Sequence, residues 1–402
     1  MTTDLAKLDA ADPLAFAKAR FRLPETILYL DGNSLGALPE ATPARLAETS
    51  EREWGERLIE SWNSAGWIDW PKQIAARLAP LVGAAPDELL VCDSTSINLF
   101  KLARAACALR PERRVILTEE GNFPTDLYML QSVAKLSGAT LEAVPREQLP
   151  EALDEAVALL ALTHVDYRSG ERHDMAALTE AAHQAGALTL WDLSHSAGVL
   201  AVDLTACHAD FAVGCGYKYL NGGPGAPAFL FVRHDLQNQC ANPLPGWFGH
   251  SSPFEFSGDY RPAEGIARFQ TGTPPILAMA ALDEGLKTFE GIEIADVEAK
   301  AQQLGDLFIE SIGDCLAIAS PERCRLRGGH VVFAHDHAYA IVQALIERGV
   351  IGDFRAPNLA RFGFAPLYLS YADVARAGEI VRDVFLSESW RELRFAERKA
   401  VT

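Results

Sequence analysis

Two charged side chains stand where apolar stretches of this chain end. Asp192 closes the apolar run in ALTLWDLSHSAG, and His195 comes three residues later. Lys218 follows the next short apolar run, FAVGCG, and lies between Tyr217 and Tyr219. A carboxylate at the end of a buried strand is costly unless it is paired, and a solvated lysine normally has polar neighbours. Both residues are therefore candidates for chemistry, although an isolated aspartate here could equally cap a turn.

An acid after one strand and a lysine after the next are what a pyridoxal 5'-phosphate (PLP) site requires. The acid keeps the pyridine nitrogen protonated, so that the ring acts as an electron sink, and the lysine holds the aldehyde as a Schiff base. The phosphate of such a cofactor is expected at a helix N-terminus, where free N–H groups and the helix dipole favour an anion.

Two junctions between a predicted strand and a predicted helix could complete this site. Ser94, Thr95 and Ser96 precede an amphipathic run; simple N-capping is the alternative, but three hydroxyls exceed what a cap requires. In EEGNFPTDLYML, Phe123 could stack on the cofactor ring. Asp126 lies near the predicted helix start, and the sequence leaves open whether only the helix dipole favours it there.

Other kinds of site are disfavoured by their spacing. The glycines after Lys218, in NGGPGAPAFLFV, lead into a strand rather than a helix, which excludes a P-loop and a dinucleotide fingerprint. The histidines lack metal-ligand spacing, and the seven cysteines form no C-x-x-C pair. We therefore predict no metal site and reduced thiols, as in a cytoplasmic protein.

The elements that must position these side chains lie between about residues 75 and 235. Strand-like runs alternate with helical runs there, which predicts right-handed βαβ units and a mostly parallel sheet. Functional residues of such a sheet gather at the carboxyl edge of the strands. Pro- and Gly-rich text over residues 242–279 predicts long loops, and a helix over about 290–313 leads into a smaller domain.

Length and charge limit the function classes. A chain of 402 residues allows two domains, and 49% hydrophobic with 22% charged residues is an ordinary globular balance. A net charge of -18 argues against nucleic acid and anionic membrane surfaces as partners. We expect no signal peptide and no membrane span, and a cytoplasmic location.

Several motifs, in order, resemble the kynureninase family. They are YLDGNSLGALP, STSINLFKL, NFPTD, WDLSHSAG, GYKYLNGGPGAPAF, GWFGH and GTPPILAM, over roughly residues 29–370. The resemblance implies the α/β fold type I of PLP enzymes, with a mostly parallel seven-stranded sheet, helices on both faces and a smaller α+β C-terminal domain. It divides the chain into an N-terminal segment (1–45) that packs with the small domain and substrate site, a large PLP-binding domain (46–285) and a small domain (286–402).

The resemblance also implies residue roles. Lys218 matches the Schiff-base lysine and Asp192 the pyridinium partner. Because Tyr217 is next to Lys218, it is our candidate for proton transfer around the γ-carbonyl and the β-carbon of the substrate. Cofactor contacts are implied for Thr95, Ser96, Phe123, Pro124, Thr125, Asp126, Thr163, Asp192, His195, Tyr217 and Lys218, and, from the other subunit of a homodimer, for Trp247 and Thr273. Arg361 matches the arginine that binds the substrate carboxylate, and the other substrate-side positions are Asn33, Ser34 and Trp67.

The implied reaction is hydrolytic cleavage of the Cβ–Cγ bond of L-kynurenine, giving anthranilate and L-alanine, as in tryptophan degradation. Trp67 and Thr273 stand where animal members of the family carry His and Asn, and both departures resemble bacterial members. Because polar groups that could engage the extra hydroxyl are replaced, we predict a preference for kynurenine over 3-hydroxykynurenine. The alternatives are an aminotransferase or cysteine desulfurase of the same fold, or a non-catalytic PLP-binding protein. The retained Lys218, Asp192 and Arg361 argue against the last.

Overall fold

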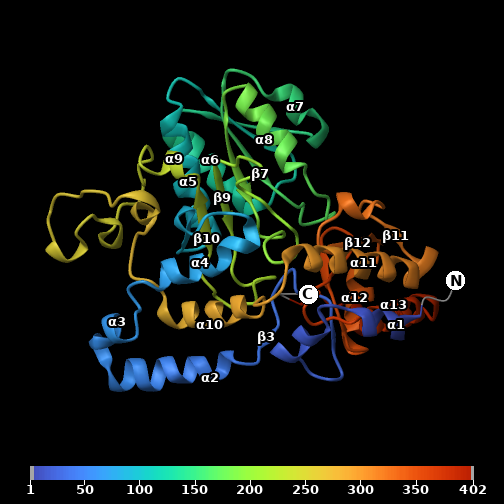
Figure 1. Ribbon diagram of the computed structural model, residues 1–402. Helices are drawn as coiled ribbons and strands as arrows, with labels where there is room; N and C mark the ends of the chain where they lie inside the picture. Colours follow the sequence, from blue (N-terminus) through green and yellow to red (C-terminus); the bar gives the residue numbers. More distant parts are fainter. Residues whose placement is uncertain (1–3, 400–402) are drawn as a thin grey trace.

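The computed structural model describes residues 4–399, so the outermost ends of the first and third expected domains, residues 1–3 and 400–402, lie outside the described residues. A seven-stranded sheet forms the centre (Figure 1). In spatial order its strands are β4 (Leu89–Val91), β10 (Phe229–Val232), β9 (Phe211–Gly214), β8 (Leu188–Asp192), β7 (Val157–Thr163), β5 (Val115–Glu119) and β6 (Thr140–Val144). The strands from β9 to β6 pair in parallel, whereas β10 is antiparallel to both its neighbours. The mostly parallel seven-stranded sheet is confirmed.

Helices cover both faces of this sheet because its central strands are apolar on both sides. All seven residues of β7 are buried; Leu159 and Ala161 pack into one apolar cluster, Leu160 and Leu162 into the other. Buried side chains of α5 (Thr95–Leu109) and α6 (Pro124–Ser137) belong to the first cluster. Those of α4 (Trp70–Val82), α8 (Met175–Gln184) and α10 (Ile276–Lys287) belong to the second.

A second, antiparallel sheet lies in the C-terminal part of the chain. Its strands, in order, are β11 (Ala317–Ile318), β12 (His330–Ala334), β15 (Leu359–Gly363) and β14 (Asp353–Arg355). Three helices accompany it: α11 (Ile294–Ile312), α12 (Ala338–Glu347) and α13 (Tyr371–Leu386). The predicted start of α11 near residue 290 is wrong by four residues, because Gly291 adopts φ +72°, a left-handed conformation that interrupts helical backbone.

The N-terminal segment joins this second sheet region. Strand β2 (Leu28–Tyr29) pairs in parallel with β13 (Val350–Ile351), and Asp31 forms a bridge to Gly363. The remaining short elements are α1 (Leu5–Ala11), β1 (Phe21–Arg22), β3 (Leu38–Pro39), α2 (Thr42–Ala47), α3 (Ser61–Ser64), α7 (Leu149–Ala152), α9 (His234–Gln237) and α14 (Leu393–Ala396). A wide, π-type turn of helix over Glu48–Glu56 continues α2. No helix among residues 4–399 is both long and apolar enough to cross a membrane.

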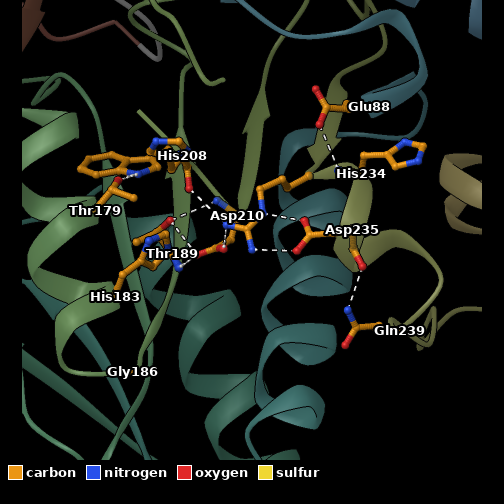
Figure 2. A network of polar contacts seen from close by, with 12 residues as sticks. Glu88, Thr179, His183, Gly186, Thr189, His208, Asp210, His234, Asp235 and Gln239 are labelled. Carbon is orange, nitrogen blue, oxygen red and sulfur yellow. Dashed lines mark hydrogen bonds and ion pairs between the residues drawn. The ribbon is translucent and has the colours of Figure 1, made fainter. Parts of the chain in front are cut away.

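A buried acid anchors the amino edge of the strands. Asp210, fully buried just before β9, accepts hydrogen bonds from the backbone N–H and the hydroxyl of Thr189. It also pairs with His183 at 2.8 Å and with Arg233 at 2.6 Å (Figure 2). This network ties β8, β9, α8 and the end of β10 together at the edge opposite Asp192, which leaves the carboxyl edge to carry the polar side chains of a site.

Two segments extend away from the body of the molecule (Figure 1). One is the helical arm from α2 to α3, and the other is the loop region after residue 240, which contains only short 3-10 turns up to α10. Both present aromatic side chains to solvent: Trp54 is 59% exposed, and Phe256 is 77% exposed.

Candidate active site

A cavity of about 230 Å³ opens at the carboxyl edge of the large sheet. The N-termini of α5 and α6, the ends of β7 and β8 and the loop after β9 form its walls. Ten of the residues expected around the cofactor line it: Thr95, Ser96, Phe123, Thr125, Asp126, Thr163, Asp192, His195, Tyr217 and Lys218. Side chains that are distant in sequence therefore meet where parallel strands end.

The N-terminus of α5 provides an anion-binding end to the cavity. Ser94 has extended backbone, and its hydroxyl accepts the N–H of Ile97, so this residue is the helix cap. The side-chain hydroxyls of Thr95 and Ser96 bond to no residue within 4–399 and face the same cavity. With the open N–H groups of a 15-residue helix, they form a cradle suited to a phosphate.

Two carboxyl groups lie at the other end. The N–H and the hydroxyl of Ser194 both donate to Oδ1 of Asp192, at 2.8 and 2.6 Å. Burial, reinforced by the charge of Asp192, raises the pKa of Asp126 well above its usual value. Burial also raises the pKa of Asp192, against the opposing effects of Ser194 and Lys218, and Asp126 donates to it. The shared proton therefore rests on Asp126, and Asp192 carries the negative charge.

Thr163 holds Asp126 in place. Its hydroxyl lies 2.6 Å from Oδ1 of Asn122 and 3.4 Å from Oδ2 of Asp126. Pro124 and Thr125 begin α6, and the Phe123 ring, which packs edge-on against Tyr167 at 5.1 Å, borders the cavity. Pro124 itself does not line the cavity, although it begins the helix whose first turn does.

Lys218 reaches into the cavity beside a neutral histidine. Its Nζ lies 3.0 Å from Nε2 of His195. Burial, followed by the nearby charges of Lys218 and Arg361, lowers the pKa of His195 well below its usual value, so the imidazole is uncharged. The backbone around Lys218 requires glycine partners: a Cβ on Gly36 would lie 2.4 Å from the Lys218 carbonyl oxygen, and Gly222 would clash with the Gly216 carbonyl.

Arg361 lies beside this cavity but not on its wall, and its guanidinium is already engaged. Nε and Nη2 donate to the two oxygens of Asp353 at 2.8 and 2.5 Å, Nη2 also to Ser34 at 3.0 Å, and Nη1 to the Tyr167 carbonyl at 2.7 Å. The bidentate fork expected for a substrate carboxylate faces Asp353 in this structure. Asn33 is fully buried nearby, and neither atom of its amide has a hydrogen-bond partner within residues 4–399.

Three expected residues lie away from the cavity. Trp67 donates Nε1–H to Glu53 at 3.0 Å and lines a separate apolar hollow with Trp54 and residues 275–278. Trp247, 39% exposed, and the exposed Thr273 belong to the region after residue 240. A single chain does not bring these three residues to Lys218.

Some residues of the site were missed by sequence reasoning. Besides Ser94, which the sequence already indicated, the cavity is lined by Tyr167, Ser194, Cys215, Ala226 and Ala228. Ser194 had a signal, because it adjoins His195, which was already named. Tyr167 and Cys215 had none, since a loop tyrosine and a buried thiol occur throughout proteins.

The donor set fits PLP. An anion cradle at a helix N-terminus, an ionised carboxylate, a primary amine and an aromatic ring face one cavity, and these are the groups that hold its phosphate, ring nitrogen, aldehyde and ring face. No group of three His, Cys, Asp or Glu that could hold a metal ion occurs within residues 4–399.

Comparison with solved structures shows the fold. A cysteine desulfurase from Thermococcus onnurineus NA1 superposes with a TM-score of 0.79 at 20% identity, covering 95% of this chain and 98% of that one. A cystine C-S lyase, C-DES, gives 0.75 at 16% identity over 89% and 98%. At such identities the likeness concerns the fold alone.

Comparison of sequences shows the family. The family model described as Kynureninase C-terminal domain matches residues 297–381. A kynureninase of Pseudomonas fluorescens is 47% identical over 416 aligned positions, covering 100% of both chains. A kynureninase of Burkholderia mallei is also 47% identical, covering 98% of both. With a relative of this identity along its whole length, the chain belongs to the kynureninase family.

Proposed function

We propose that this protein is a PLP-dependent hydrolase that cleaves the Cβ–Cγ bond of L-kynurenine, giving anthranilate and L-alanine. The family gives the reaction, and one observation supports it most: Lys218 and Asp192 line the same cavity as the N-terminus of α5. This is the arrangement in which a lysine amine, a ring-nitrogen partner and a phosphate cradle serve one cofactor.

When bound in this cavity, PLP supplies an electron sink for the charge left on the substrate by loss of a proton or of a carbon fragment. The chain's own residues do the rest. Thr95, Ser96 and the α5 N–H groups bind the phosphate, and the ionised Asp192 holds a proton on the ring nitrogen. Lys218 tethers the cofactor and, once released, moves the substrate α-proton, with the neutral His195 3.0 Å away.

Tyr217 is the proton donor on the substrate side. Burial, with the nearby Cys215 and Asp192, raises the pKa of its phenol above the usual value, so it keeps its proton at neutral pH. Its ring lies 5.8 Å from Nζ of Lys218. Water adds to the γ-carbonyl, the Cβ–Cγ bond breaks so that the water oxygen leaves in the carboxylate of anthranilate, and Tyr217 donates the proton that the β-carbon then takes up. Arg361, Ser34 and Asn33 form the carboxylate side of the substrate site, and the predicted preference for kynurenine over its 3-hydroxy form stays a prediction.

The desulfurase alternative requires a nucleophilic cysteine beside the cofactor. Cys215 does line the cavity, but burial raises the pKa of its thiol, and its Sγ points to the Ser194 carbonyl oxygen at 3.8 Å. A buried protonated thiol is a poor nucleophile. The site therefore favours hydrolysis of a carbon–carbon bond over removal of sulfur.

Product analysis tests this function. Holoenzyme incubated with L-kynurenine should release anthranilate, followed by its fluorescence, and alanine in a one-to-one ratio. Alanine without anthranilate, conversion of the cofactor to its amine form, or sulfide release from L-cysteine as the main activity would identify one of the alternatives instead.

We also propose a homodimer whose active sites lie at the subunit interface. Exposed aromatic residues on both extended arms and the position of Trp247 and Thr273 outside the cavity support it, because a second copy could cover these surfaces and bring both residues to a site. Sedimentation equilibrium should give twice the chain mass of 43.7 kDa. A single-chain mass at micromolar concentration would refute this assembly. A cytoplasmic location stays a prediction from the sequence.

A further inference from the structure

Four charged side chains meet between the N-terminal segment and the C-terminal sheet, beside the active-site cavity. Asp353 on β14 is the centre of this cluster: Arg361 on β15 binds both of its oxygens, and Nη2 of Arg355 lies 2.6 Å from Oδ2. The hydroxyl of Ser34 donates to the same Oδ2 at 2.9 Å. Asp31 is the fourth member, so two arginines balance two carboxylates when all are ionised.

Asp31 is the carboxylate of this cluster that lacks a cation. It is bridged to Gly363, two residues after Arg361, yet it forms no ion pair within residues 4–399. Its Oδ1 is buried without a hydrogen-bond partner, as is Nε of Arg355. An unpartnered acceptor and an unpartnered donor are thus both left in one charged cluster.

The electrostatics separate the two acids. Burial, and then the charge of Asp353, raise the pKa of Asp31 to about 7, with Arg361, Ser34 and Arg355 opposing. Burial acts on Asp353 as well, but Arg361 and Arg355 together hold its pKa below the usual value. The other titratable groups that face Asp31 are tyrosines with raised pKa values, which stay neutral: Tyr29, Tyr219 and Tyr368.

A substrate carboxylate at this place would add a third negative charge to two arginines. The cluster also approaches the cavity through Arg355, whose charge acts on Tyr217 and which is itself affected by Tyr167, both of them cavity residues. The Asp353 carboxylate does not readily take up a proton, because Arg355 and Arg361 both bind its ionised form. Asp31 can take up a proton more readily, since no cation within residues 4–399 forms an ion pair with it.

We propose that Asp31 takes up a proton when the substrate carboxylate binds beside Arg355 and Arg361, and that this restores the charge balance of the cluster. Asp31 is then a positioning residue that acts through the two arginines and favours ligands with a single carboxylate. The inference rests on the proposed role of Arg361 in binding that carboxylate.

The consequence is a defined pH dependence of ligand binding. Below pH 7 most free enzyme already carries the proton, so the carboxylate meets a net positive cluster. Above pH 7 the proton must be taken from solvent, and the dissociation constant should rise by about tenfold per pH unit.

The test is calorimetric titration of holoenzyme with 4-oxo-4-phenylbutanoate, a kynurenine skeleton without amino groups, so that no ligand amine titrates. Measurements at pH 6 and pH 8, in two buffers of different ionisation enthalpy, give the protons taken up. We expect each bound ligand to be accompanied by uptake of about 0.9 proton at pH 8 and about 0.1 proton at pH 6. The dissociation constant should be about tenfold larger at pH 8 than at pH 6. Asp31→Asn should abolish the uptake and make the two constants equal. Asp296→Asn, the same change at an exposed position on α11, should match the wild type.

Each outcome is decisive. No proton uptake by the wild type at pH 8 overturns the inference even if Asp31→Asn does not fold, and unchanged uptake in Asp31→Asn assigns the proton to another group. Failure of the wild type to bind the ligand, or equal affinity in Arg361→Lys, refutes the carboxylate site at Arg361 and with it the role of Asp31, whereas the hydrolase function is decided separately by the anthranilate and alanine analysis. Binding that depends on Arg361 but takes up no proton refutes only the role of Asp31.

Discussion

Replacing Lys218 with alanine should reduce the rate of anthranilate formation from L-kynurenine by at least about a thousandfold. Lys218 is the lysine that lines the cavity in the part of the chain that the structure describes. Its amine is the proposed tether and also the group that moves the α-proton, so one substitution removes both functions. The initial rate of anthranilate fluorescence, with saturating PLP, measures the effect.

The control for this variant is Lys135→Ala, which removes an exposed lysine on α6 and should leave the rate unchanged. Added methylamine should restore part of the lost rate in Lys218→Ala, because a small amine can enter the space that the side chain vacates. A Lys218→Ala enzyme with a tenth or more of the wild-type rate would show that another group carries the chemistry.

Asp192→Asn should lower kcat by a factor on the order of 10² to 10⁴, the range of a positioned acid–base group. An amide has the shape of the carboxylate but not its charge, so it cannot hold a proton on the ring nitrogen. In the wild type the N–H and the hydroxyl of Ser194 both donate to Oδ1 of Asp192. If the NH₂ group of the asparagine took the place of that oxygen, both hydrogen bonds would be lost. The kcat at saturating substrate and cofactor is the measurement.

Asp126→Asn is the matched comparison, because the two acids lie together but differ in protonation. Burial and the charge of Asp192 raise the pKa of Asp126, which therefore already acts as a neutral donor to Asp192. An amide can donate in the same way, so its loss of kcat should be at least tenfold smaller than that of Asp192→Asn. Equal losses in the two variants would contradict the assignment of the charge to Asp192.

The pattern of apolar residues in the sequence was sufficient to predict the central sheet, because the central strands are apolar on both faces. The run over β7 could only be a buried strand, and the residues that follow β8 and β9 had to lie at the same edge of a parallel sheet. Asp192 and Lys218 could therefore be paired from the sequence. The start of α11 was misplaced because the pattern of apolar residues does not reveal the backbone conformation of Gly291.

Contacts between segments that are distant in sequence could not be predicted in this way. The Arg361 fork is occupied by Asp353, and Ser34 joins the pair from 327 residues away. Periodicity carries no information about such a contact; the one local signal was the alternation of Asp353 and Arg355, which places both side chains on one face of β14. The proposed roles of Trp247 and Thr273 require a second copy of the chain, because both residues lie outside the cavity of a single chain.

The most direct test of the account is to find the side chain that carries the cofactor. Holoenzyme reduced with sodium borohydride, digested and mapped by mass spectrometry should show the cofactor mass on the peptide that contains Lys218. Lys101 is the informative comparison, because it is fully buried on α5 but held by Asp93 at 2.7 Å. Cofactor on Lys218 alone is the result that the account predicts; cofactor on Lys101 or any other lysine, or no labelled peptide, would contradict it.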